Sequence, residues 1–267
     1  MFHDYDLLLP RNAFSARDAA RAGDVWRAFQ DAATLSSTDF GWPPERYRAE
    51  QIAFVVRQQT TAHQGEARYG DTVRARTCLK EFRRGLLVTR ELWLEGPGGP
   101  IARSTQEWAH VRITTEGMRP FRAPPELIDD FSVHPEIQSV DLPAFDAIEG
   151  ARERVFGFRC WFTWMDPLDH ANHPAYVDWC DEAISIAMAE AGLSPVVLQP
   201  VAERVKWRLG VQAPAEVTVR TRVAGVTAAG DVVCHHRIEV CSDVAALAWT
   251  VRRLAGGGCE ALLHALR

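Results

Sequence analysis

Short runs of the chain alternate between apolar and polar residues, and each half also contains one run with helical spacing. In the run 73–77, valine and alanine alternate with arginines, which is the period of a half-buried strand. We predict strands in the first half at 52–60, 72–79, 86–94 and 102–113, and in the second half at 155–164, 217–223, 232–240 and 245–254.

Apolar residues at helical spacing predict one long helix in each half. The positions in the first half are Val25, Trp26, Phe29, Ala32 and Ala33, and the prolines after Gly41 end that helix. The second helix covers about 174–191, with one face made by Val177, Cys180, Ile184, Ala187, Met188 and Ala191. Pro174 suits its first turn and Gly192 its C-terminal stop.

The order of these elements repeats, and the stretch 72–77 resembles 216–221 in sequence. We therefore predict a duplicated α+β chain, with a first unit over 1–117, a linker over 118–150 and a second unit over 151–267. The prolines and acidic residues of the linker are typical of a segment that crosses a surface rather than of a strand. A sheet around one very apolar helix buries both economically.

Composition excludes some classes of function. The 267 residues carry a formal charge of −5, which gives no reason to expect binding to nucleic acid or an anionic membrane. No apolar run is long enough to span a bilayer, and the first residues do not resemble a signal peptide, so we expect a cytoplasmic protein. The six cysteines lack metal-finger spacing, which predicts buried free thiols. His235 and His236 are neighbours on a strand and point to opposite faces, so they predict no metal site.

The densest polar cluster, 164–176, lies between a strand and the start of the second helix. It contains Asp166, His170 and Asn172. The start of a helix has unpaired N–H groups that can polarise a carbonyl oxygen, so the cluster is suited to attack on an activated acyl group. The alternative is structural, because Asn172 or His173 can equally be the helix N-cap. Spacing alone leaves both interpretations open.

The pattern Asp166-x-x-x-His170-x-Asn172-x-x-x-Tyr176, followed by Trp179 and an acidic pair, resembles the strand-turn-helix signature of hotdog-fold thioesterases. Gly70-Asp71 before an apolar run, the two-half layout and the Arg119-Pro120 linker resemble the double-hotdog acyl-ACP thioesterases within the 4-hydroxybenzoyl-CoA thioesterase-like superfamily. This resemblance implies a tandem hotdog. Each antiparallel sheet wraps around one long helix, and the two sheets join into a continuous one.

The resemblance also implies a function, the hydrolysis of a fatty acyl-ACP or acyl-CoA thioester in a cleft between the halves. Such enzymes use no metal or organic cofactor, and the chain is expected to be a monomer or homodimer. Asp166 would be the catalytic carboxylate. His170 and Asn172 would orient water and hold the thioester, with backbone N–H groups near the helix start as oxyanion donors. The implied substrate-binding residues are His63, Gln64, Glu66, Tyr176, Trp179 and Gln212.

The sequence departs from the plant-type pattern at several positions. Leu168 replaces an Asn, Asp169 a Gly and His173 a second Asn, and a Glu is replaced by Val211 or Gln212; in the first half, Ser15 falls about where Asp166 does. Two alternatives therefore stay open. One is a hotdog hydratase or dehydratase, although the chain lacks the Gly-Asp-x-Asn-Pro-x-His pattern of those enzymes. The other is a catalytically degenerate protein that binds acyl-CoA or acyl-ACP.

Overall fold

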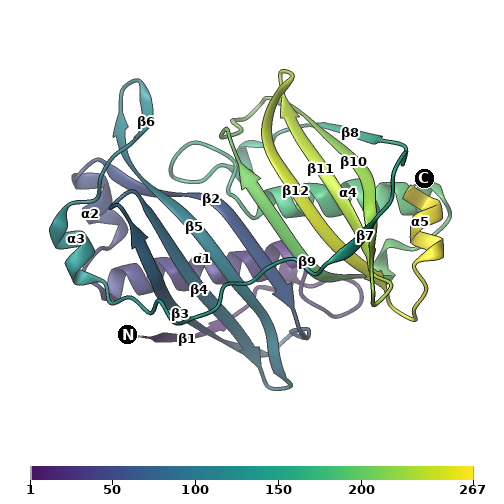
Figure 1. Ribbon diagram of the computed structural model, residues 1–267, viewed down its shortest axis with the longest axis horizontal. Coiled ribbons are helices and arrows are strands. Elements are labelled where there is room, and N and C mark those ends of the chain that lie inside the picture. Colours follow the sequence, from purple (N-terminus) through teal and green to yellow (C-terminus); the bar gives the residue numbers. More distant parts are fainter. Residues whose placement is uncertain (1, 267) are drawn as a thin grey trace. The chain divides into compact units, whose positions relative to one another are not determined.

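The computed structural model describes residues 2–266, which form two compact units. The first comprises the chain up to Arg11 together with Val25–Val140, and the second comprises Asn12–Asp24 and the residues from Asp141 onwards. Each unit contains an antiparallel sheet with one long helix running along it, α1 (Ala22–Asp39) in the first and α4 (Ala175–Glu190) in the second (Figure 1).

The first sheet has the strand order β1-β3-β4-β5-β2, with the short strand β6 added beside β5. Its strands are β1 (His3–Leu8), β2 (Ile52–His63), β3 (Thr72–Arg83), β4 (Leu87–Gly96), β5 (Gly99–Thr114) and β6 (Gly117–Pro120). The short helices α2 (Pro44–Ala49) and α3 (Pro125–Asp130) lie in the same unit. Side chains from 40–54, 79–88 and 121–131, together with Trp108, form a hydrophobic cluster that includes the buried Trp42.

The second sheet repeats this order as β8-β10-β11-β12-β9, with the short strand β7 also paired to β10. Its strands are β7 (Phe145–Ala147), β8 (Arg154–Arg159), β9 (Leu198–Trp207), β10 (Glu216–Thr227), β11 (Val232–Val240) and β12 (Asp243–Leu254). The chain ends in the short helix α5 (Glu260–Leu266). The two units therefore have one topology.

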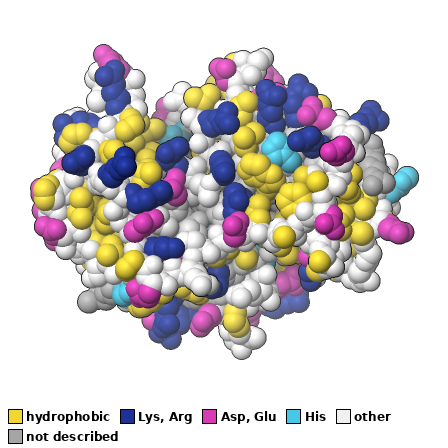
Figure 2. Space-filling view, viewed as in Figure 1, with side chains coloured by type: hydrophobic (Ala, Val, Ile, Leu, Met, Phe, Trp, Pro, Cys, Tyr) yellow, Lys and Arg dark blue, Asp and Glu magenta, His cyan; other side chains and the backbone are white. Residues whose placement is uncertain are grey.

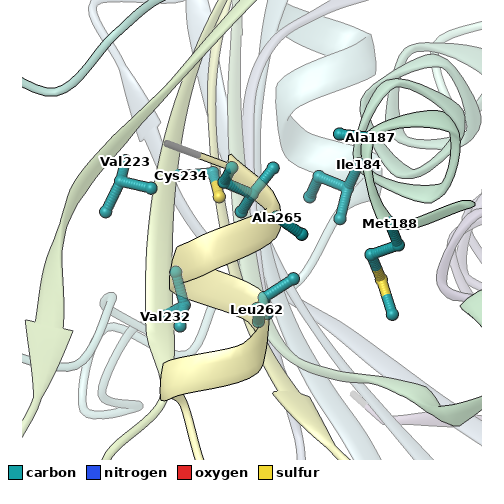
Figure 3. Packing of buried hydrophobic residues seen from close by; sticks show 9 residues of the cluster. Ile184, Ala187, Met188, Val223, Val232, Cys234, Leu262 and Ala265 are labelled. Atoms are coloured by element: carbon teal, nitrogen blue, oxygen red, sulfur yellow. The ribbon is translucent and has the colours of Figure 1, made fainter. Parts of the chain in front are cut away.

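The predicted apolar face of α4 is buried, apart from its last member. Ala191 is exposed because the helix ends at Glu190. Gly192 follows with φ +75°, and the N–H of Leu193 donates to the carbonyl of Met188, which closes the helix as the sequence predicts. Figure 3 shows side chains of α4 and α5 converging with side chains of β10 and β11, and this cluster forms one core of the second unit.

Three predictions need correction. The strand predicted at 155–164 ends at Arg159, and a 3₁₀ turn, Phe162–Trp164, follows it. The segment predicted as a plain linker contains β6, α3 and β7, each short and paired or packed locally. Strand β9 was not predicted, because Pro200 and three charged residues interrupt its apolar pattern. Pro200 lies at a bulge, where a missing N–H is tolerated.

Basic, acidic and hydrophobic side chains are interspersed over the face seen in Figure 2. Among residues 2–266, no helix combines the length and the apolar character that crossing a membrane requires.

Candidate functional site

The polar cluster forms a tight turn between two short paired segments. The N–H of Asp166 donates to the carbonyl of His170 (2.9 Å), and the N–H of Asp169 donates to the carbonyl of Asp166 (3.0 Å). Asp169 has φ +59°, which completes a turn of the type used in three-residue hairpins. Pro167 at the second position favours this turn because its ring fixes φ. The turn therefore places Asp166 and His170 at its two ends, opposite each other.

Both oxygens of the Asp166 carboxylate have partners in this turn. Oδ1 accepts the N–H of Leu168 at 2.8 Å, and Oδ2 lies 3.3 Å from Nδ1 of His170. The side chains of Asp166 and His170 are 14% and 20% exposed, so both are mostly shielded but retain some contact with solvent. A proton on Nδ1 would donate to the carboxylate and would leave Nε2 of the imidazole as an acceptor.

Gly210 lets the imidazole lie directly against a neighbouring loop. A Cβ at this position would come within 3.1 to 3.3 Å of the Cβ, Cδ2 and Cγ atoms of His170. The same loop also holds the turn by a backbone hydrogen bond, since the N–H of Ala171 donates to the carbonyl of Val211 (2.7 Å). Gln212 donates from Nε2 to the carbonyl of Asp169 (3.0 Å). In the structure Gln212 thus braces the turn, and sequence reasoning gave no signal for Gly210.

Tyr176 and Trp179 belong to a group of aromatic rings beneath the turn. Tyr176 is buried, its ring centroid lies 4.4 Å from that of Trp179, and its hydroxyl accepts the N–H of Val211 (3.3 Å). Burial raises the pKa of the Tyr176 phenol, so it stays neutral. The other aromatic residues of the group are Phe158, Trp161, Trp164, His173 and Trp207. These rings form a rigid apolar support for the polar turn.

The N-capping interpretation fails for Asn172. Pro174 is the N-cap of α4, and no side chain caps the helix. The side-chain oxygen of Asn172 is buried and accepts no hydrogen bond from the residues that the structure describes. The side chain of Asn172 therefore does not cap the helix, and its buried unpaired amide oxygen needs another explanation.

Three backbone N–H groups at the helix start are already engaged. The N–H of Asn172 donates to Trp164, that of Ala175 to Asn172 and that of Tyr176 to His173. A carbonyl oxygen in this site therefore needs a different donor. The N–H of His170 has no acceptor within residues 2–266, and it lies at the end of the turn that also carries the carboxylate.

The first half contains a copy of this turn at 13–21. Ser15 occupies the place of Asp166, since its N–H donates to the carbonyl of Ala19 and its carbonyl accepts the N–H of Asp18. Asp18 has φ +56°, matching Asp169. The Ser15 hydroxyl accepts the N–H of Arg17, as Asp166 does for Leu168. Ala19 replaces His170, so this copy has the backbone without the carboxylate and imidazole.

No protein-family model matches the sequence, and no curated protein matches it. Solved structures do match. A protein described as an oleoyl thioesterase from Lactobacillus plantarum is similar with a TM-score of 0.79 and 18% identity, covering 95% of this chain and 96% of that chain. The fold is that of acyl-ACP thioesterases. An acyl-ACP thioesterase from Bacteroides thetaiotaomicron matches with a TM-score of 0.73 and 11% identity, over 94% of this chain and 98% of that one. A 12:0-ACP thioesterase from Umbellularia californica matches with a TM-score of 0.73 and 15% identity, over 95% and 94%.

Three of the residues that were predicted to bind substrate lie in the first unit of this hotdog chain. His63 is the last residue of β2, the N–H of Gln64 donates to the carbonyl of Ile101 (2.8 Å), and Glu66 forms an ion pair with Arg68 (3.3 Å). The structure places these three together at the end of β2.

The remaining candidates for metal or thiol chemistry have ordinary structural surroundings. Within the described part of the hotdog chain, no group of His, Cys, Asp and Glu is arranged to hold a metal ion. His236 is buried between two threonine hydroxyls, whereas His235 packs on Trp249. All six cysteines are free, and four of them are buried as predicted; Cys241 is exposed and Cys259 is only partly buried, so the predicted burial is wrong for these two.

Proposed function

We propose that this chain is a thioester hydrolase that acts on an acyl group carried by acyl carrier protein or coenzyme A. Two findings support the proposal. The three similar structures carry thioesterase names and match over at least 94% of this chain. The second unit holds an accessible carboxylate and an imidazole 3.3 Å apart at one turn.

The comparison of the turn at Asp166 with its copy at Ser15 supports a chemical role for Asp166. The copy at Ser15 forms the same backbone hydrogen bonds with only a hydroxyl at this place, so the fold of the turn does not require a carboxylate. The second carboxylate oxygen and the imidazole of His170 are therefore additions to a turn that is complete without them. Such additions at an accessible position favour a catalytic role over a structural one.

In the proposed reaction Asp166 acts as a general base. It accepts a proton from a water molecule while the water oxygen attacks the thioester carbon; the carbon–sulfur bond then breaks, and the thiolate leaves with a proton from solvent. Direct attack by the carboxylate is the nucleophilic variant of the same scheme. His170 donates to Asp166 and fixes its orientation. The N–H of His170 and the amide of Asn172 are the groups that we assign to the carbonyl oxygen and the water.

Further details stay predictions from the sequence. They are the cleft between the halves, the joining of the two sheets, their curvature around α1 and α4, a cytoplasmic location and the assembly state. His63, Gln64 and Glu66 belong to the cleft prediction, and Tyr176, Trp179 and Gln212 to substrate binding. A hydratase would change the acyl group without releasing thiol, and a binding protein would hold acyl-CoA without turnover, so thiol release separates the three functions.

The deciding experiment replaces Asp166 with Asn. Asn accepts the same turn hydrogen bond but can act neither as base nor as nucleophile. We expect thiol release from acyl-CoA and acyl-ACP to fall by at least about 100-fold while acyl-CoA binding persists. Asp169→Asn is the matched control, because Asp169 is exposed in the same turn and Asn tolerates positive φ. Full activity in Asp166→Asn would overturn the assignment.

A further inference from the structure

Arg90 is a charged residue inside the first unit. It lies on β4 and is 6% exposed. The residues from Val88 to Leu92 are all buried, and Val88 and Leu92, two positions away on either side, share the face of Arg90. One hydrogen bond is made by its guanidinium, from Nη1 to the hydroxyl of Thr77 on β3 at 3.1 Å.

No carboxylate pairs with Arg90 in the part of the chain that the structure describes. The second unit provides a comparison. Arg252 is also buried, but it donates to the carboxylates of Asp181 and Glu203 and to backbone carbonyls. Buried arginines normally have such partners, because an uncompensated charge in the interior is costly.

Burial lowers the pKa of Arg90 to about 10, which still leaves the guanidinium charged at neutral pH. A guanidinium has five N–H donors in a planar fork, and Thr77 uses one of them. The other N–H groups of Arg90 make no hydrogen bond to the residues that the structure describes.

Three polar side chains lie near Arg90, and two of them already have partners, since the hydroxyl of Tyr5 bonds to Asp39 and that of Tyr47 to Ser37. The phenols of Tyr5 and Tyr47 and the charge of Arg90 interact electrostatically. The Ser36 hydroxyl, next to Tyr5, is fully buried and has no hydrogen-bond partner of good geometry within residues 2–266. The guanidinium donors that Thr77 does not use, together with the Ser36 hydroxyl, fit a small planar anion with one negative charge. A phosphate carries more charge and needs more donors than this site offers.

We propose that Arg90 binds the carboxylate of a carboxylic acid or ω-carboxyacyl ligand inside the first unit, against α1 and β4. The proposal names a substrate class for the proposed thioesterase and in that respect rests on the proposed function. Two sources can supply the same carboxylate: the distal end of a dicarboxylic acyl group, or a free acid such as the hydrolysis product.

The first test measures binding without catalysis. Hexanedioate, octanedioate and decanedioate, with the diols of equal length as uncharged controls, are titrated against the whole protein by thermal shift and calorimetry. We expect at least one diacid to raise the melting temperature of the wild type, and Arg90→Met to weaken its binding by about 10- to 100-fold. Arg74→Met, at an exposed position of β3, should bind as the wild type does. Equal binding by wild type and Arg90→Met overturns the proposal, as does wild-type binding to none of the acids.

The second test distinguishes the sources. Hydrolysis of ω-carboxyacyl-CoA is compared with that of methyl-terminated acyl-CoA of the same length. A loss of kcat/KM in Arg90→Met for the carboxylated substrate alone assigns the site to the distal carboxylate. Equal kcat/KM with a loss of inhibition by free acid assigns it to the product. If the wild type hydrolyses no thioester, the proposed function fails, while the binding test still decides the role of Arg90.

Discussion

His236 is held between two hydroxyl groups in the middle of the second sheet. Its Nδ1 lies 2.8 Å from the hydroxyl of Thr221 on β10, and its Nε2 lies 2.8 Å from that of Thr250 on β12. The side chain is fully buried. Burial, with smaller contributions from Arg252 and His235, lowers the pKa of His236 from 6.5 to about 3. The imidazole therefore stays neutral in the native state over most of the acidic range.

This burial predicts a pH dependence of stability. Below pH 6.5 the unfolded chain binds a proton at His236 and the native state does not, so unfolding becomes more favourable as the pH falls towards about 3. Above pH 6.5 the imidazole is neutral in both the native and the unfolded state, so it does not lower the free energy of unfolding there. We expect the free energy of unfolding to fall less steeply in His236→Gln than in the wild type between about pH 7 and about pH 5. Urea unfolding measures both slopes, and parallel slopes would contradict the assignment.

At the scale of elements, the loop after β9 sets the position of His170. An alanine at Gly210 would crowd the imidazole and push it away by a few tenths of an ångström. We expect Gly210→Ala to lower kcat/KM by about tenfold or more, because reacting groups tolerate little displacement. Stability should change by less than about 1 kcal/mol, since Gly210 is exposed.

Gly98→Ala is the matched control, because a Cβ at Gly98 meets nothing within 4 Å. Kinetics and thermal unfolding of both variants check the prediction. Unchanged kinetics in Gly210→Ala would mean that the position of His170 against this loop does not matter for turnover.

The pattern of apolar and polar residues predicted those strands and helices whose own sequence has a regular apolar period. The strands at 217–223 and 232–240 and the helix α4 have apolar faces that can be read without a partner. Strand β9 could not be read in this way. Its Glu203 is fully buried only because Arg252, 49 residues later, neutralises it. A pairing across such a distance leaves no trace in the strand itself.

The sequence predicted where the site lies along the chain, but it did not predict the distances between the side chains of the site. The cluster of Asp166, His170 and Asn172 marked the place where strand and helix meet. The distance between the carboxylate and the imidazole depends on a residue with positive φ, Asp169, and on a glycine in another loop. Whether Asn172 caps the helix depends on where α4 begins, and boundaries are what periodicity defines least well.

At the scale of the whole molecule, each unit encloses one buried arginine among residues 2–266, Arg90 in the first and Arg252 in the second, and the charges around the two differ. Arg252→Met would leave two carboxylates of the second unit without their cation, so we expect a loss of about 3–5 kcal/mol in the free energy of unfolding. Arg90→Met removes a cation that has no carboxylate partner, and Thr77 keeps its hydrogen bond to the carbonyl of Glu91. We therefore expect no loss of stability, or a gain.

Chemical denaturation of the whole chain compares the two variants. If Arg90→Met lost as much stability as Arg252→Met, the result would contradict the expectation, because it would mean that a group of the protein neutralises Arg90. A difference in the expected direction would identify Arg90 as a residue kept at the expense of stability, which is a property of binding sites rather than of cores.

The turn that occurs twice separates what evolution can vary from what it must keep. Because the backbone of the copy at Ser15 persists with a hydroxyl and a methyl group, a lineage can gain or lose a reactive pair there by two side-chain changes, with little risk of misfolding. A gene that holds two such turns can mutate one while the other continues to work. Two side chains, and not the backbone, therefore separate a turn that carries a carboxylate and an imidazole from one that carries neither.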